Sequence, residues 1–200
     1  MARKNMKSGN NKSSRIRGKT IRTGRASDHG ELVDDRVHVF VDDQNLFWGI
    51  VNNDYGPAFR IDFGELLLNA ARGSDGRSRG VATAYIAGVV PDDDSFWLIA
   101  KNQGFKVRRG YLGTKSRSKQ DDAYLITEIT KTICRSDGPS TIVLVAGDAD
   151  YGPPLEFAIE EKWRTELAFT SSDFISAALE PCVHEIRQIF PADIEYIRHT

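Results

Sequence analysis

The chain has 200 residues, 40% apolar content and a formal net charge of −1 at pH 7. This length suits one domain with a tail, and the apolar content is enough for a core of ordinary size. No run of about 18 apolar residues is present, so we expect no membrane span, and no apolar segment follows the basic start as in a secretory signal. Two cysteines without metal-ligand spacing, Cys134 and Cys182, predict reduced thiols and a cytoplasmic protein.

The near-zero net charge conceals an asymmetry. Residues 1–30 contain nine Lys/Arg and one acid, whereas the rest of the chain holds 18 basic and 27 acidic residues. The first segment is rich in Ser, Gly and Asn and has too few aliphatic side chains to offset its ordering entropy. We therefore predict a basic, disordered tail over 1–35 and one domain over 36–200. The tail either binds nucleic acid without sequence preference, solubilises the protein or rests on the acidic body.

Short apolar runs alternate with helical patterns from residue 37 onward. In chain order we expect a strand at 37–41, a helix at 61–72, a strand at 81–90, a helix from 94 or 95 to 102, a strand at 105–111, a helix at 122–135, a strand at 141–146, a helix at 155–162, a strand at 165–169 and a last helix at 174–189 that Pro181 could interrupt. Nearly unbroken β-branched runs predict strands covered on both faces. The pattern indicates a doubly wound α/β fold with a mainly parallel sheet of about five strands.

Aspartates stand where such a sheet binds ligands, at the carboxyl ends of its strands. Asp42 follows the first strand, Asp148 and Asp150 follow the fourth after Gly147, and Asp122 begins a helix. Each alone also suits a helix cap or a turn. Together they would repel one another unless a hard divalent cation, Mg²⁺ or Mn²⁺, binds between their oxygens.

Four further residues lie close to these aspartates in the sequence. Asn45 could hold a phosphate oxygen or fix the Asp42 carboxylate, or be a polar turn residue, and Asp43 reads as a solvated neighbour or an outer group. Asp121 adjoins Asp122, and either of the two could be the ligand. Glu128 could hold a second metal or orient a water, or be an ordinary exposed acid.

A basic segment precedes the second acidic cluster. Its cations are Arg108, Arg109, Lys115, Arg117 and Lys119, interspersed with Gly and Ser in the manner of a mobile loop. Such a loop would grip phosphates beside the metal site, because an acidic pocket needs neighbouring cations to admit a polyanion. The alternative is ordinary solvated charge.

Three motifs in order resemble the NYN domain family, a PIN-like ribonuclease group, and especially its bacterial LabA-like members. The family's Asp-x-x-Asn-x-aromatic after a strand is matched by Asp42, Asn45 and Phe47, and its Lys-x-x-Asp with an acid six residues later by Lys119, Asp122 and Glu128. Its Ser-Gly-Asp-x-Asp-Phe-x-Pro-Leu is matched by residues 146–155, with Ala146 in place of the serine. Order and spacing agree over about residues 36–170.

The resemblance implies a PIN-like, Rossmann-like three-layer sandwich and a Mg²⁺ or Mn²⁺ ribonuclease site. It supports Asp42, Asp122, Asp148 and Asp150 as the acidic set. Two departures are notable: Glu128 stands where aspartate is common, and Ala146 removes a hydroxyl that could support a carboxylate.

We therefore expect a metal-dependent endoribonuclease with Asp42, Asp122, Asp148, Asp150 and Asn45 as catalytic residues, Glu128 as a further metal ligand, and RNA as partner. One alternative is an RNA-binding or regulatory module that has lost turnover. An aspartyl phosphatase fits less well, because it would need an acid where this chain has Gln44. The sequence leaves the oligomeric state open, a homodimer included.

Overall fold

The computed structural model describes residues 36–89, 94–112, 118–119 and 121–196. The strands are β1 Val37–Asp42, β2 Val81–Gly88, β3 Lys106–Arg109, β4 Tyr111–Leu112, β5 Ser118–Lys119, β6 Thr141–Val145, β7 Arg164–Phe169 and β8 Glu185–Gln188. The helices are α1 Asp43–Ile50, α2 Phe63–Ala71, α3 Asp94–Asn102, α4 Asp121–Arg135 and α5 Gly152–Glu160. A π-helical turn, η1 Val51–Tyr55, extends α1, and 3-10 turns lie at η2 Ala149–Tyr151, η3 Ser172–Phe174, η4 Ala177–Cys182 and η5 Pro191–Asp193.

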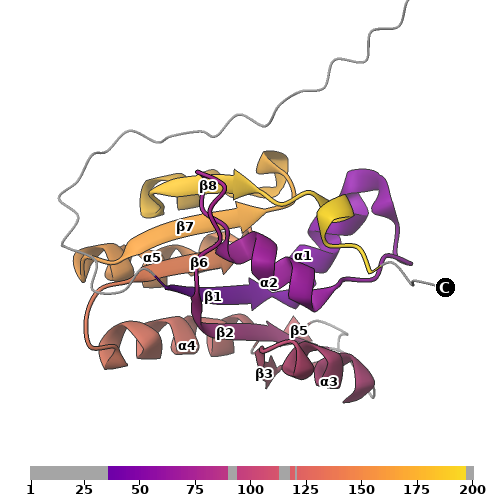
Figure 1. The fold of residues 1–200 in the computed structure, drawn as a ribbon, viewed down its shortest axis with the longest axis horizontal. Helices are drawn as coiled ribbons and strands as arrows, with labels where there is room; N and C mark the ends of the chain where they lie inside the picture. The colour runs from indigo at the N-terminus through magenta and orange to yellow at the C-terminus, as the bar shows by residue number, and fades with distance from the viewer. Residues whose placement is uncertain (1–35, 90–93, 113–117, 120, 197–200) are drawn as a thin grey trace, which may run out of the picture.

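Six strands form one parallel sheet in the order β3-β2-β1-β6-β7-β8 (Figure 1). The chain winds from β1 outward through β2 to β3, then returns to β6 on the other side of β1 and continues to β7 and β8. Right-handed crossovers place α1, α2 and α3 on one face of the sheet and α4 and α5 on the other. The winding therefore reverses between β1 and β6, where doubly wound sheets bind ligands.

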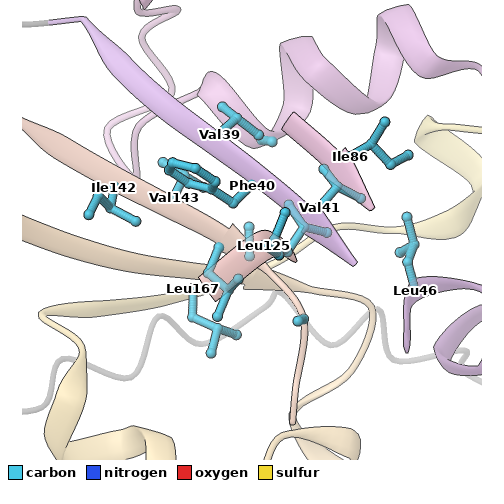
Figure 2. Packing of buried hydrophobic residues seen from close by; sticks show 14 of the residues in the cluster. Val39, Phe40, Val41, Leu46, Ile86, Leu125, Ile142, Val143 and Leu167 are labelled. Carbon is cyan, nitrogen blue, oxygen red and sulfur yellow. The ribbon is translucent and has the colours of Figure 1, made fainter. Parts of the chain in front are cut away.

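The core lies on both faces of the central strands. All six residues of β1 and all five of β6 are buried, as the unbroken apolar runs predict. Val39 of β1 lies opposite Ala84 of β2 and Val143 of β6. Leu125 of α4 packs against this centre (Figure 2). The ends of β1 and β6 that lead to acidic residues are therefore held by a close-packed core.

The expected α/β fold with a mainly parallel sheet is confirmed, with three differences. The sheet has six strands rather than about five, and the helix expected at 174–189 is wrong. That stretch forms η3, η4 with Pro181 inside it, and the edge strand β8. Proline interrupts helical hydrogen bonding, and the open edge of β7 offers β8 a complete set of backbone partners. Helix α1, which the sequence pattern did not suggest, follows β1 without a loop.

A buried ionic cluster holds β7, β8 and the entry to β2 together. Glu166 on β7 is only 1% exposed. Arg79 binds it in bidentate fashion, with N–O distances of 2.9 and 2.7 Å. Arg164 donates to Glu166 at 2.8 Å and to Glu185 at 2.7 Å, and Arg187 of β8 approaches Glu166 at 3.4 Å. Although burial opposes it, these arginines hold the pKa of Glu166 below its usual value.

Glu166→Gln should lower the free energy of unfolding by about 3–5 kcal/mol, because it removes the shared partner of three arginines in a buried site. The measurement is urea unfolding at neutral pH. The matched control is Asp75→Asn, which removes a charge from the exposed Arg77–Asp75 pair and should leave the unfolding midpoint unchanged. Equal midpoints for wild type and the Glu166 variant would contradict the structural role of the cluster.

Candidate metal centre at the carboxyl ends of the central strands

Three carboxylates meet where β1 ends and α4 begins. Asp42 is the last residue of β1, and Asp121 and Asp122 open α4. One carboxylate oxygen from each lies within 4.8 Å of the other two. Asp42 is also the N-cap of α1, and its Oδ1 accepts a hydrogen bond from the Asn45 N–H at 2.9 Å. The backbone therefore fixes this carboxylate as it fixes any helix cap.

Burial changes the protonation of this group. Asp42 is 4% exposed, and burial, with smaller contributions from the charges of Asp122 and Asp121, raises its pKa to about 7. Burial also raises the pKa of Asp122, and the charges of Asp121 and Asp148 add to the effect. Of the two expectations for Asp43, a solvated neighbour or an outer group of the site, the first is wrong. Asp43 is buried instead, and burial and the charge of Asp121 raise its pKa to about 7. Such carboxylates retain protons near neutral pH unless a cation compensates them.

Tyr151 joins two of the three carboxylates. Its ring is fully buried in η2, and its hydroxyl donates to Asp42 Oδ2 at 2.9 Å. The same hydroxyl lies 3.4 Å from Asp122 Oδ1. The turn η2, which follows β6, therefore contributes a hydrogen-bond donor to acids that come from β1 and α4.

Asn45 links the ends of β1 and β6. Its side-chain Oδ1 accepts a hydrogen bond from the Gly147 N–H at 2.7 Å. A Cβ at Gly147 would collide with the Phe174 carbonyl, so only glycine fits where β6 leaves the sheet. The Gly147 carbonyl accepts from the Ser176 N–H at 2.8 Å. Asn45 thus positions the strand end that carries Asp148.

Asp148 and Asp150 follow the end of β6. Both are exposed, and Asp148 Oδ1 accepts from the Asp150 N–H at 3.1 Å. The charge of Asp148 reaches Asp122, whose pKa it raises. Neither belongs to the close group of three, in which Asp121 stands beside Asp42 and Asp122.

Glu128 lies further along α4, where cations neutralise it. Its Oε1 accepts hydrogen bonds from Arg108 Nε at 3.1 Å and from Lys131 Nζ at 3.2 Å. Burial opposes ionisation here, but these two cations lower the pKa of Glu128 overall. The Arg108 guanidinium also lies 5.8 Å from the centre of the Tyr85 ring. The Glu128 carboxylate is therefore engaged with Arg108, and it does not belong to the close acidic group.

The remaining predicted RNA-binding cations lie only partly within the described residues. Arg109 is exposed at the end of β3, the strand that also carries Arg108. Lys115, Arg117 and the side chain of Lys119 lie outside the described residues, as does the tail at 1–35.

Asp121, Asp43 and Tyr151 contribute more to the site than the sequence suggested. Which of Asp121 and Asp122 faces the site depends on the rotation of α4 about its axis. In the structure both carboxylates reach the site. Asp43 directly follows Asp42 at the end of a buried strand, and this position was a signal that the Asp43 side chain is buried. Tyr151 lies within the motif at residues 146–155, but no local pattern indicated its contact with Asp42, which is 109 positions away.

The donor set suits a hard divalent cation. All three groups supply carboxylate oxygens, which Mg²⁺ and Mn²⁺ prefer to nitrogen or sulfur ligands. Two buried acids with raised pKa values beside the switch point of a doubly wound sheet are typical of a functional site rather than of a structural ion pair. This combination of a doubly wound parallel sheet and an acidic group at its switch point therefore suits the binding of a divalent cation.

The NYN domain model matches residues 36–186, and the chain belongs to this family. A crystal structure of a protein of unknown function from Vibrio parahaemolyticus RIMD 2210633 has the same fold, with a TM-score of 0.62 at 18% identity. The match covers 86% of this chain and 100% of that one. No curated protein matches the sequence. Within the described part of the chain, no helix combines the length and apolar character needed to cross a membrane.

The metal-free protein should lose stability as pH rises between about pH 5 and about pH 8. Asp42 and Asp43 have folded-state pKa values of about 7, above the value of about 3.9 in an unfolded chain. The folded state therefore binds more protons than the unfolded state in this window. This contribution is complete below about pH 4 and is lost as pH passes about 7.

Urea midpoints in EDTA across this range measure the effect, and Asp43→Asn tests its source. Because the variant removes one of the carboxylates with a raised pKa, its midpoint should vary less with pH than that of wild type. Parallel curves for the two proteins would show that Asp43 does not carry a raised pKa.

Proposed function

We propose that the protein is a metal-dependent endoribonuclease that hydrolyses RNA phosphodiester bonds. The observation that carries this proposal is the group of three carboxylates, largely buried and within 4.8 Å, at the switch point of an NYN domain. Burying several acids together without a compensating positive charge is unfavourable. Their burial here therefore favours a site that binds a cation.

Asp42, Asp122 and Asp121 would hold Mg²⁺ or Mn²⁺, with Asp148 and Asp150 at the rim. When bound, the cation lowers the pKa of a coordinated water and stabilises charge on the phosphate. Asp42 is held in a fixed orientation by the Asn45 N–H. The exposed carboxylate of Asp148 lies outside the buried group and is available to a water or a further ligand at the open side of the site.

Cations beside the site would hold the RNA strand. Arg108 is half-buried and committed to Glu128, whereas Arg109 is exposed. In this proposal Arg109, Lys115, Arg117 and Lys119 contact phosphates, and Arg108 contacts phosphate while its ion pair with Glu128 joins β3 to α4. The free cysteines Cys134 and Cys182 are compatible with the cytoplasmic location that we propose.

Asp122→Asn should reduce RNA cleavage by about 100-fold or more, because it weakens metal binding and charge stabilisation together. Labelled single-stranded and structured RNAs are incubated with the protein in Mn²⁺, in Mg²⁺ and in EDTA. Asp137→Asn is the matched control, since Asp137 is exposed just beyond the other end of α4 and should leave cleavage unchanged.

Two outcomes would overturn the nuclease proposal. Full cleavage by the Asp122 variant would remove this residue from the site. RNA binding without cleavage, insensitive to EDTA, would identify a binding module of the same fold, to which the missing hydroxyl at Ala146 already points.

Neutralising the tail should flatten the salt dependence of RNA binding. The nine Lys/Arg of residues 1–30 are replaced by Gln at constant length, and affinity is measured over a series of salt concentrations. On single-stranded RNA, the slope of log K against log salt should fall by about 0.7 for each phosphate that the tail no longer neutralises. An unchanged slope would mean that the tail does not bind RNA.

A further inference from the structure

The Tyr151 hydroxyl occupies an unusual position. Its ring is 0% exposed, and the hydroxyl lies 2.9 Å from Asp42 Oδ2 and 3.4 Å from Asp122 Oδ1. A buried tyrosine ordinarily finds one polar partner for its hydroxyl. Here both neighbours are carboxylates of the candidate metal centre, and they come from different elements, β1 and α4.

Tyr151 remains a proton donor at neutral pH. A tyrosine hydroxyl is ordinarily protonated at neutral pH, and both of its polar neighbours here are carboxylates, which accept hydrogen bonds. Its proton therefore stays on the oxygen and points toward a carboxylate. When the carboxylate is ionised, as it is when it binds a cation, such a hydrogen bond is about twice as strong as one between neutral groups.

Two donors fix the Asp42 carboxylate without exhausting it. Oδ1 accepts from the Asn45 N–H and Oδ2 accepts from Tyr151, so the plane of the carboxylate cannot rotate freely. Each carboxylate oxygen has two lone pairs, so one lone pair on each oxygen is still available to a cation. The same hydroxyl lies within hydrogen-bond distance of both Asp42 and Asp122 and therefore offsets part of the repulsion between them.

We propose that Tyr151 is a positioning residue of the metal centre, whose hydroxyl orients Asp42 and holds Asp122 close to it so that the carboxylates are arranged before a divalent cation binds. This inference rests on the metal-binding part of the proposed function and does not require RNA cleavage. Hydrogen bonds to metal ligands from neighbouring residues commonly change metal affinity by about 10- to 100-fold.

The test is the affinity of the full-length protein for Mn²⁺, measured from the electron paramagnetic resonance signal of free Mn²⁺. Tyr151→Phe removes the hydroxyl and keeps the ring, so the packing of η2 is preserved. We expect about tenfold weaker Mn²⁺ binding by this variant. Tyr85→Phe is the matched control, because it makes the same chemical change on β2 in a ring that stacks on Phe40, and its Mn²⁺ affinity should equal that of wild type.

Melting temperatures in EDTA are recorded for all three proteins, and Mn²⁺ binding is measured well below the lowest of them. Mn²⁺ affinity of Tyr151→Phe within about twofold of wild type, whether or not its melting temperature falls, would overturn the proposal and leave a packing role alone. Equal losses in both variants would overturn it as well. Tight Mn²⁺ binding without RNA cleavage would overturn the nuclease function but leave this test intact, whereas wild type that binds no Mn²⁺ would overturn both.

Discussion

The structure depends on one electrostatic constraint, the gathering of carboxylates at the carboxyl ends of parallel strands. Asp42, Asp121 and Asp122 each bring an oxygen within 4.8 Å of the others, and burial strengthens their repulsion. Two helix N-termini partly offset this cost, because Asp42 caps α1 and the other two lie in the first turn of α4. The Tyr151 hydroxyl adds a third stabilising contact. Helix termini and a neutral hydroxyl therefore hold Asp42 in the metal-free site.

A second buried acid in the same sheet, Glu166, has a different electrostatic environment. Glu166 is as deeply buried as Asp42, yet Arg79, Arg164 and Arg187 surround it and lower its pKa. Asp42 has hydroxyl and amide partners instead, and its pKa rises to about 7. The Glu166 cluster is a structural ion-pair network, whereas the environment of Asp42 favours the arrival of a positive charge. The burial of an acidic side chain therefore does not by itself distinguish a candidate metal site from a structural ion-pair network.

Sheet topology brings the parts of the site together. Because the winding reverses between β1 and β6, the loops after these strands diverge to opposite faces and leave their ends open. Asn45 closes the gap between the strand ends through Gly147, and the tight passage of Gly147 past Phe174 directs the chain toward Asp148 and Tyr151. The order of strands thus determines which acids can meet, and the turn chemistry determines how closely.

The sequence by itself determined the alternation of strands and helices, the burial of β1 and β6, and the placement of Asp42 and Asp148 at strand ends, because these follow from local periodicity and from the rule that parallel strands end at one edge. It did not determine β8, since a strand at an edge depends on the neighbour that it pairs with and not on its own pattern. Tertiary structure alone decided that Asp121 joins Asp122, that Glu128 turns to Arg108, and that Tyr151 reaches Asp42. These contacts depend on helix rotation and on distances between segments far apart in the chain, which no local pattern encodes.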